Sequence, residues 1–156
     1  MRGKAYIISC YLAVVFCCCA FACDVSDDTN FPAAAARARQ TNRPLLLAFL
    51  GTDWSISSLK LDREVFDQAE FADDSKYNFL LCKIHFYQTR ERAADVLVQN
   101  QQLAEKFHVD QFPMVIVLNP NGVELGRLGY IAGGPQKFAA AVNEIIVRGR
   151  DKAKAN

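Results

Sequence analysis

The amino-acid sequence predicts one α/β domain, in which a mixed central sheet of about four strands is flanked by helices. Segments with a helical period alternate with short apolar runs, in the order helix, strand, helix, strand, helix, strand, strand, helix. The last two strands are separated only by a turn, as in a hairpin. The 156 residues, less an N-terminal segment, suffice for a single hydrophobic core.

The first helix is predicted at residues 31 to 40, an alanine-rich stretch. Asn30 is a favoured N-cap residue, and Pro32 fits the first turn, where its missing N–H costs no hydrogen bond. Asn42 and Pro44 are expected to end the helix, because neither continues a helical turn well.

Two strands follow from different apolar patterns. Residues 44 to 50 form a continuous apolar run closed by Gly51, which predicts a central strand buried on both faces. Residues 78 to 86 alternate, so that one face carries a different set of side chains from the other. The first set is Leu80, Cys82, Ile84 and Phe86, and the second is Phe79, Leu81, Lys83 and His85. Cys82 is therefore expected among apolar neighbours.

Further helices are expected beside these strands. One spans residues 55 to 66, with the apolar residues Ile56, Leu59 and Phe66 among charged ones. A shorter helical turn is predicted at 68 to 73. Another helix spans 94 to 107 and places on one side Val96, Leu103 and Phe107.

The C-terminal part predicts a hairpin and a last helix. Residues 114 to 118 are a β-branched strand, 119 to 122 form a turn, and 123 to 130 return as the partner strand. Pro135 then opens a helix after two glycines. Its buried stripe is expected to contain Phe138, Val142, Ile145 and Ile146, and its basic end contains Arg148 and Arg150.

Residues 1 to 22 have the layout of a signal peptide. Arg2 and Lys4 precede a stretch from 5 to 22 without a charged side chain, and small residues stand at the two positions that a signal peptidase reads. Export is therefore predicted, to the periplasm or the cell envelope, with the mature protein starting at Cys23.

Two alternatives apply to the same segment. Its 18 uncharged residues reach the lower limit for a membrane-spanning helix. Cys23 also stands where a bacterial lipoprotein is lipidated, which would anchor the domain without spanning the membrane. Ala20, however, occupies a position where such signals usually carry Leu.

The expected organisation is a signal peptide at 1–22, a polar leader at 23–30, the domain at 31–148 and a basic tail at 149–156. The exported part keeps 16 basic and 17 acidic residues, so a nucleic-acid partner is not expected. Cys82 is the single cysteine inside the domain, which must therefore fold without an internal disulfide.

Several segments together carry a family resemblance. They are GTDWSISSLKLDREVF, QNQQLAEKFHV, FPMVIVLNPNGVELGRLGY and AGGPQKF. In order and spacing they resemble the thioredoxin-like fold superfamily, and most closely the DsbH-type periplasmic disulfide reductases, over about residues 31 to 147. The resemblance implies a thioredoxin-like fold and, in active members, a Cys-x-x-Cys pair after the Trp.

The resemblance places the two redox cysteines of the family at Ser55 and Ser58. Trp54, the following Lys60-Leu61 pair and the proline after Phe112 match the family. A serine hydroxyl is not ionised near neutral pH, and oxygen cannot form the mixed disulfide through which the electrons pass. Dithiol chemistry at this loop is therefore excluded, while Ser remains a good N-cap residue for the helix.

Other chemistry finds little support among the residues. His85 and His108 are the only bases for a serine hydrolase, and neither is expected to reach the loop. Asp53 is expected to be solvated or to cap backbone N–H groups. Cys82 and His85 lie on opposite faces of one strand, so no metal site is predicted, and no cofactor is expected.

The family resemblance also implies that Pro113 follows a cis peptide bond beside the loop. Trp54, Ile56, Phe112 and Pro113 would then form a small apolar groove for an extended polypeptide. The predicted function is an exported thioredoxin-fold protein that binds such a client without redox chemistry.

Two other functions stay open. The first is a thiol–disulfide oxidoreductase, either because the serines are engineered replacements or because Cys82 or Cys23 acts instead. The second is a structural envelope protein, lipid-anchored through Cys23.

Overall fold

The computed structural model describes residues 29 to 155, with the backbone alone at 74–76 and 153–155. The predicted signal peptide, Cys23 and nearly all of the leader lie outside these residues.

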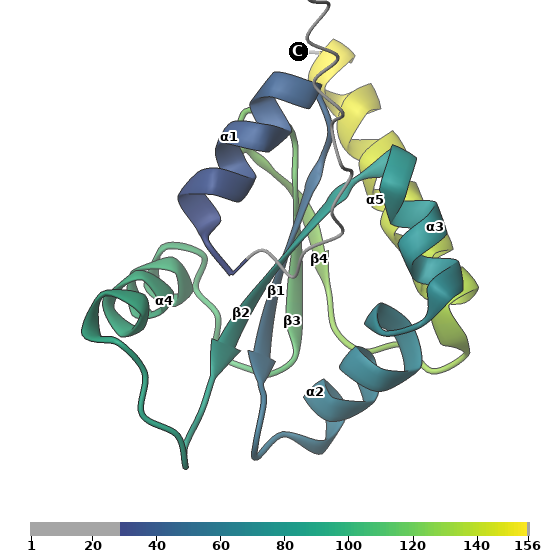
Figure 1. Cartoon of the computed structure of the whole chain (residues 1–156). Coiled ribbons are helices and arrows are strands. Elements are labelled where there is room, and N and C mark those ends of the chain that lie inside the picture. Colours follow the sequence, from purple (N-terminus) through teal and green to yellow (C-terminus); the bar gives the residue numbers. More distant parts are fainter. Residues whose placement is uncertain (1–28, 156) are drawn as a thin grey trace, which may run out of the picture.

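The sheet has four strands in the order β2-β1-β3-β4 (Figure 1). They are β1 Leu45–Gly51, β2 Leu80–Phe86, β3 Met114–Leu118 and β4 Glu124–Leu128. β1 pairs in parallel with β2 and antiparallel with β3, and β3 pairs antiparallel with β4. The predicted mixed sheet is confirmed.

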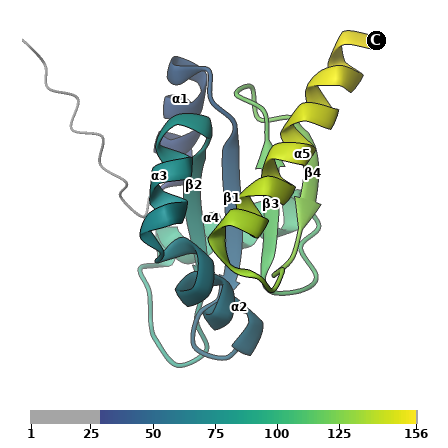
Figure 2. The same ribbon diagram turned by 90° about the vertical axis from the view of Figure 1, so that its right-hand side faces the viewer.

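Helices cover both faces of this sheet. They are α1 Phe31–Thr41, α2 Ile56–Leu61, the π-helical turn η1 Asp62–Phe66, α3 Ala69–Asn78, α4 Ala94–Lys106 and α5 Gly134–Ala155. In Figure 2, α3 and α5 lie in front of the sheet, and α1 and α4 lie behind it. Of the helices in residues 29–155, none is both long and apolar enough to cross a bilayer.

β1 is the centre of the packing. All seven of its residues are buried, and alternate side chains join two separate apolar clusters. Leu46, Ala48 and Leu50 face the cluster under α3 and α5, whereas Leu45, Leu47 and Phe49 face the cluster under α1 and α4. A strand covered on both faces explains the continuous apolar run in the sequence.

The expected faces of β2 are also confirmed. Cys82 and Ile84 pack in the α1/α4 cluster, and Phe79 packs in the other. Cys82 is fully buried, so its burial and apolar neighbours agree with the prediction for this side chain.

The helix after β1 differs from its prediction. Ser55 is its N-cap, and the π turn at Asp62–Phe66 adds residues to one turn. Ile56, an apolar residue of the predicted helix, is 72% exposed. The side chains that this segment buries are Ser58, Leu61, Val65 and Phe66. A 3.6-residue period does not anticipate an inserted π turn.

Other element ends also differ. α3 is longer than the turn expected at 68–73, and β4 is shorter than 123–130. The predicted basic tail at 149–156 continues α5 as far as Ala155. Near its end α5 packs closely on β4, because Gly149 is buried and a Cβ there would lie 2.7 Å from a methyl group of Leu125.

The buried side of α4 also differs from its prediction. Val96 is only half-buried, whereas Asn100 is buried and donates to the His85 carbonyl at 3.0 Å.

Lys83 is a buried cation on β2. It is 2% exposed, and its Nζ lies 2.8 Å from Oδ1 of Asp62 in η1 and 3.7 Å from Oδ1 of Asp67. Its ammonium group also lies 5.5 Å from the ring centroid of Phe66. A charge this far from water needs a partner, so the ion pair ties the π turn to the sheet.

We therefore expect Asp62→Asn to lower the free energy of unfolding by about 1–3 kcal/mol, because it leaves the buried ammonium without its closest carboxylate. Asp67→Asn is the matched control and should cost less than about 0.5 kcal/mol, since that carboxylate is exposed and farther away. Adding Lys83→Met to Asp62→Asn should recover most of the loss. Urea unfolding measures all three, and equal effects of the two Asp→Asn changes would contradict this role.

Candidate functional site

The candidate site lies where β1 and β2 end at the same edge of the sheet. The loop after β1 leads into α2, and the loop after β2 leads towards α4 on the other side (Figure 1). The segment before β3, with Phe112 and Pro113, meets the first loop through Ser55. Three chain segments therefore converge beside Ser55.

Gly51 sets the path of the first loop. A Cβ on Gly51 would lie 2.7 Å from two ring atoms of Trp54 and 2.9 Å from the Ser55 Cβ. The indole therefore lies directly over the glycine backbone, and any larger residue at 51 would displace it.

Ser55 caps α2 and fastens it to the segment before β3. Its Oγ accepts a hydrogen bond from the Ser58 N–H at 3.3 Å and donates one to the Phe112 carbonyl at 3.2 Å. The predicted N-cap role is confirmed, and only 8% of Ser55 is exposed.

Ser58 is tied to the end of β1. It is 1% exposed, and its Oγ accepts a hydrogen bond from the Gly51 N–H at 3.0 Å. Both hydroxyls thus complete backbone hydrogen bonding, and neither serine contacts a histidine in the described part of the chain.

The Phe112–Pro113 peptide bond is cis, as expected. Pro113 is buried, so it holds the backbone of Phe112 rather than presenting its own ring. The Phe112 carbonyl is taken by Ser55, whereas the Phe112 N–H has no hydrogen-bond partner within residues 29–155. One backbone donor is therefore left beside the loop.

Aromatic rings connect the three segments. The ring of Phe112 lies 5.3 Å from that of Trp54 and 5.0 Å from that of Phe86, both in edge-on geometry. Trp54 is 41% exposed, Phe112 is half-buried, and the strongly exposed Ile56 follows Trp54 by two residues. We call Trp54, Ile56 and Phe112 together the Trp54 surface.

His85 reaches the first loop, contrary to the expectation that neither histidine would. Its Nδ1 lies 2.8 Å from Oγ1 of Thr52. The reason is the parallel pairing of β1 and β2, which places His85 opposite Leu50, two residues before Thr52. This contact orients the imidazole towards a threonine rather than towards Ser55 or Ser58.

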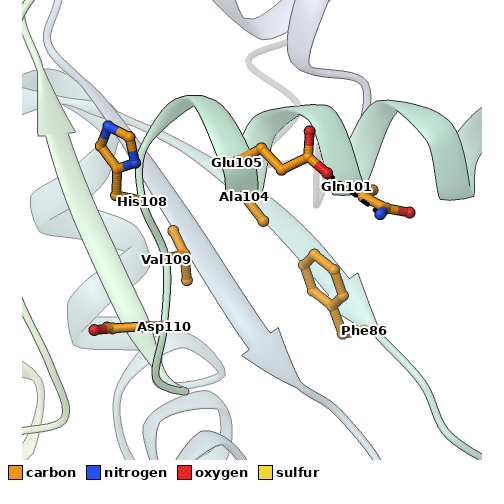
Figure 3. A pocket seen from close by; sticks show the side chains of 7 residues that line it. All are labelled: Phe86, Gln101, Ala104, Glu105, His108, Val109 and Asp110. Atoms are coloured by element: carbon orange, nitrogen blue, oxygen red, sulfur yellow. Dashed lines mark hydrogen bonds between the residues drawn. The ribbon is translucent and has the colours of Figure 1, made fainter.

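A hollow of about 610 Å³ lies on the α4 side of Phe86. Figure 3 shows its lining side chains, which are Phe86, Gln101, Ala104, Glu105, His108, Val109 and Asp110. Apolar side chains form part of it, and Gln101 donates to the Glu105 carboxylate at 3.3 Å. His108 therefore lies in this hollow and not at the serines. In residues 29–155 no group of three His, Cys, Asp or Glu side chains is arranged to hold a metal ion.

Asp53 fastens the loop after β2 to the loop after β1. Its carboxylate accepts hydrogen bonds from the Gln88 N–H at 2.9 Å, from the Thr89 N–H at 2.8 Å and from the Thr89 hydroxyl. The Thr89 hydroxyl and then the Gln88 N–H lower the pKa of Asp53 from 3.8 to about 2. The sequence suggested capping by Asp53 but gave no sign of these partners, since 87–93 lacks any period.

Comparison with known proteins identifies similar chains. The pattern of the family described as "Thioredoxin-like domain" matches residues 31–146. "Disulfide bond reductase DsbH" of Chlamydia pneumoniae is 23% identical over 117 residues, covering 75% of this chain and 70% of that protein. "Thioredoxin-related protein DsbJ" of the same organism is 26% identical over 100 residues, covering 64% of this chain but 29% of that protein.

Solved structures agree in fold. The structure "DsbH Oxidoreductase" matches with a TM-score of 0.70 and 23% identity, covering 74% of this chain and 80% of the other. A thioredoxin from Thermus thermophilus matches with a TM-score of 0.57 and 18% identity, covering 76% and 85%. The thioredoxin-like fold predicted from the sequence is confirmed.

Ser58→Ala should lower the free energy of unfolding by about 1–3 kcal/mol, because it leaves the buried Gly51 N–H without an acceptor. Ser57, one residue earlier, is exposed, so Ser57→Ala is the matched control and should change stability by less than about 0.5 kcal/mol. Chemical denaturation compares the two variants. Equal stabilities would show that the Ser58 hydroxyl is not structural.

Thr89→Val should raise the pKa of Asp53 towards its ordinary value, because the variant removes the largest cause of the lowering. The carboxyl-carbon chemical shift of Asp53 reports this titration. A lowered pKa stabilises the folded state fully above the unfolded value near 3.8, and this contribution disappears as pH falls towards 2. The variant should therefore unfold at a higher pH during acid titration. Thr41→Val on α1 is the control and should leave the pKa of Asp53 unchanged. A wild-type Asp53 with a pKa near 3.8 would show that the hydrogen bonds from Gln88 and Thr89 do not hold its carboxylate.

Proposed function

The chain belongs to the thioredoxin-like domain family, and on that premise we propose that it is an exported protein that binds an extended polypeptide without exchanging dithiols at Ser55 and Ser58. Export rests on the layout of residues 1 to 22. An acylated Cys23 would additionally tether the same domain to a membrane surface.

The observation that carries the proposal is the position of two serines in the segment after Trp54. Disulfide exchange needs a thiolate that attacks a sulfur atom and a second thiol that resolves the mixed disulfide. Oxygen supplies neither step. Both hydroxyls are instead used to cap α2 and to pair the Gly51 N–H. These hydrogen bonds hold the loop in place, while the serines provide no sulfur atom for the exchange.

The Trp54 surface supports polypeptide binding. Trp54 and Ile56 expose apolar area beside the unpaired Phe112 N–H. An extended peptide can bury its side chains on this apolar area and accept a main-chain hydrogen bond from the Phe112 N–H. Strand-like peptides are commonly recognised in this way. Pro113 keeps this donor in place.

A disulfide reductase is the second candidate, favoured by the name of the Chlamydia pneumoniae relative. Such an activity would need a thiol in this chain. Cys82 is fully buried in the α1/α4 cluster, where a thiolate is disfavoured and a disulfide has no access. Once the predicted signal peptide is removed, Cys23 is the other cysteine of the sequence, so a reductase would have to act through it.

Trp54 is the only tryptophan of the chain, so its fluorescence reports directly on this surface. We expect the neutral peptide acetyl-Ser-Val-Gln-Val-Gln-Ser-amide to change the emission saturably. Ile56→Ser should weaken binding by about 10-fold, which corresponds to losing most of one buried aliphatic side chain. Val123→Ser, at an exposed apolar residue of the β3–β4 turn, is the matched control and should bind as the wild type does.

A purified wild-type protein that leaves Trp54 emission unchanged at millimolar peptide would overturn the proposed binding. The reductase candidate is separated by insulin reduction with dithiothreitol. Wild-type protein should not accelerate it, whereas Ser55→Cys combined with Ser58→Cys should. Acceleration by the wild type, abolished by Cys82→Ala or Cys23→Ala, would establish the reductase instead.

A further inference from the structure

The loop between β2 and α4 is fastened to the candidate site at several points. The Asp53 carboxylate holds Gln88 and Thr89, the Thr52 N–H donates to the Phe86 carbonyl at 2.9 Å, and Thr52 also contacts His85. These contacts place residues 87 to 92 next to the loop after β1, which contains Trp54.

Two arginines of this loop lie over one aromatic ring. The guanidinium carbon of Arg92 is 4.2 Å from the ring centroid of Tyr87, and that of Arg90 is 5.8 Å from it. Both arginines are exposed. Tyr87 itself is half-buried and lies 5.9 Å from the His85 ring, which supports it from the sheet side.

Neither guanidinium is paired with a carboxylate in the part of the chain that the structure describes. Glu91 lies between them in sequence yet forms no ion pair with either. Asp53 is also close, but its oxygens already accept hydrogen bonds from Gln88 and Thr89. The two arginines therefore keep their N–H groups available.

A guanidinium group held over an aromatic ring has lost part of its freedom before a ligand arrives. Because both arginines are exposed, their N–H groups remain accessible, and a guanidinium group matches the two oxygens of a carboxylate. This arrangement lowers the entropy cost of binding an anion compared with a free surface arginine. A carboxylate is therefore the ligand that the loop is built to accept.

The loop also borders the Trp54 surface. Phe86, the residue before Tyr87, packs its ring on Phe112, and Asp53 immediately precedes Trp54. A peptide on the Trp54 surface can therefore extend a flanking residue towards Arg90 and Arg92.

We propose that Arg90 and Arg92, which lie over the ring of Tyr87, bind a carboxylate of the polypeptide that occupies the Trp54 surface, so that the protein selects acidic extended segments. This inference rests on the proposed function and adds the substrate class. The carboxylate can come from a Glu or Asp side chain or from the C-terminus of the client.

The test uses the full mature protein and Trp54 fluorescence with four peptides. The parent is acetyl-Ser-Val-Gln-Val-Gln-Ser-amide. Two relatives replace both Gln residues by Glu or by Lys, and the fourth is the parent with a free C-terminal carboxylate. We expect the Glu peptide to bind about 3- to 10-fold more tightly than the parent at 20 mM salt, as two partly exposed ion pairs allow. The Lys peptide should bind more weakly than the parent, and both differences should shrink at 300 mM salt.

Arg90→Gln combined with Arg92→Gln should abolish the preference for Glu while leaving the affinity for the parent peptide nearly unchanged. The control, Arg148→Gln with Arg150→Gln, removes the same charge near the C-terminal end of α5, at the opposite end of the molecule (Figure 1). It should keep the preference. If the free-acid peptide gains affinity as the Glu peptide does, and loses it in the same variant, a C-terminal carboxylate is also bound.

Equal affinities for the Glu and parent peptides would overturn this inference while leaving the proposed function intact. A preference that persists without Arg90 and Arg92 would overturn it as well. Loss of binding to anionic phosphatidylglycerol vesicles in the double variant, without any peptide preference, would assign the loop to a membrane surface instead. If no peptide binds, the proposed function fails and this inference fails with it.

Discussion

The burial of β1 on both faces is the constraint on which the rest of the structure depends. Each of its side chains belongs to one of two apolar clusters, so the strand cannot shift by one residue without exchanging the two sets. The parallel register with β2 and the antiparallel register with β3 are thereby fixed. The end of β1 at Gly51 then determines where Trp54 and Ser55 lie. The candidate site inherits its geometry from this core.

The two serines after Trp54 hold the loop through hydrogen bonds to the backbone. Ser55 joins α2 to the cis-proline segment, and Ser58 joins α2 to β1. A hydroxyl is a good acceptor for backbone N–H groups, so these two hydrogen bonds favour a rigid loop. Rigidity suits a surface that binds a ligand, because less conformational entropy is lost on association.

The sequence predicted the parts of the fold that depend on period and burial. The continuous run of β1 and the alternation of β2 placed both strands and buried Cys82 correctly. The π turn was missed, because apolar spacing assumes a regular helix. The polar contacts between different elements could not be predicted from the spacing of apolar residues, since they join residues far apart in sequence. Lys83 with Asp62 and Asp53 with Thr89 are of this kind. The cis bond at Pro113 came from the family resemblance alone.

The burial of Cys82 has a consequence for where this domain can work. Within residues 29–155 it is the only cysteine, so this part of the chain holds no internal disulfide. The apolar clusters on either side of β1 hold this part of the chain together without a covalent link that thiols or oxidants attack. The stability of this part of the chain therefore comes from burying the two apolar clusters and not from oxidising a pair of thiols inside it.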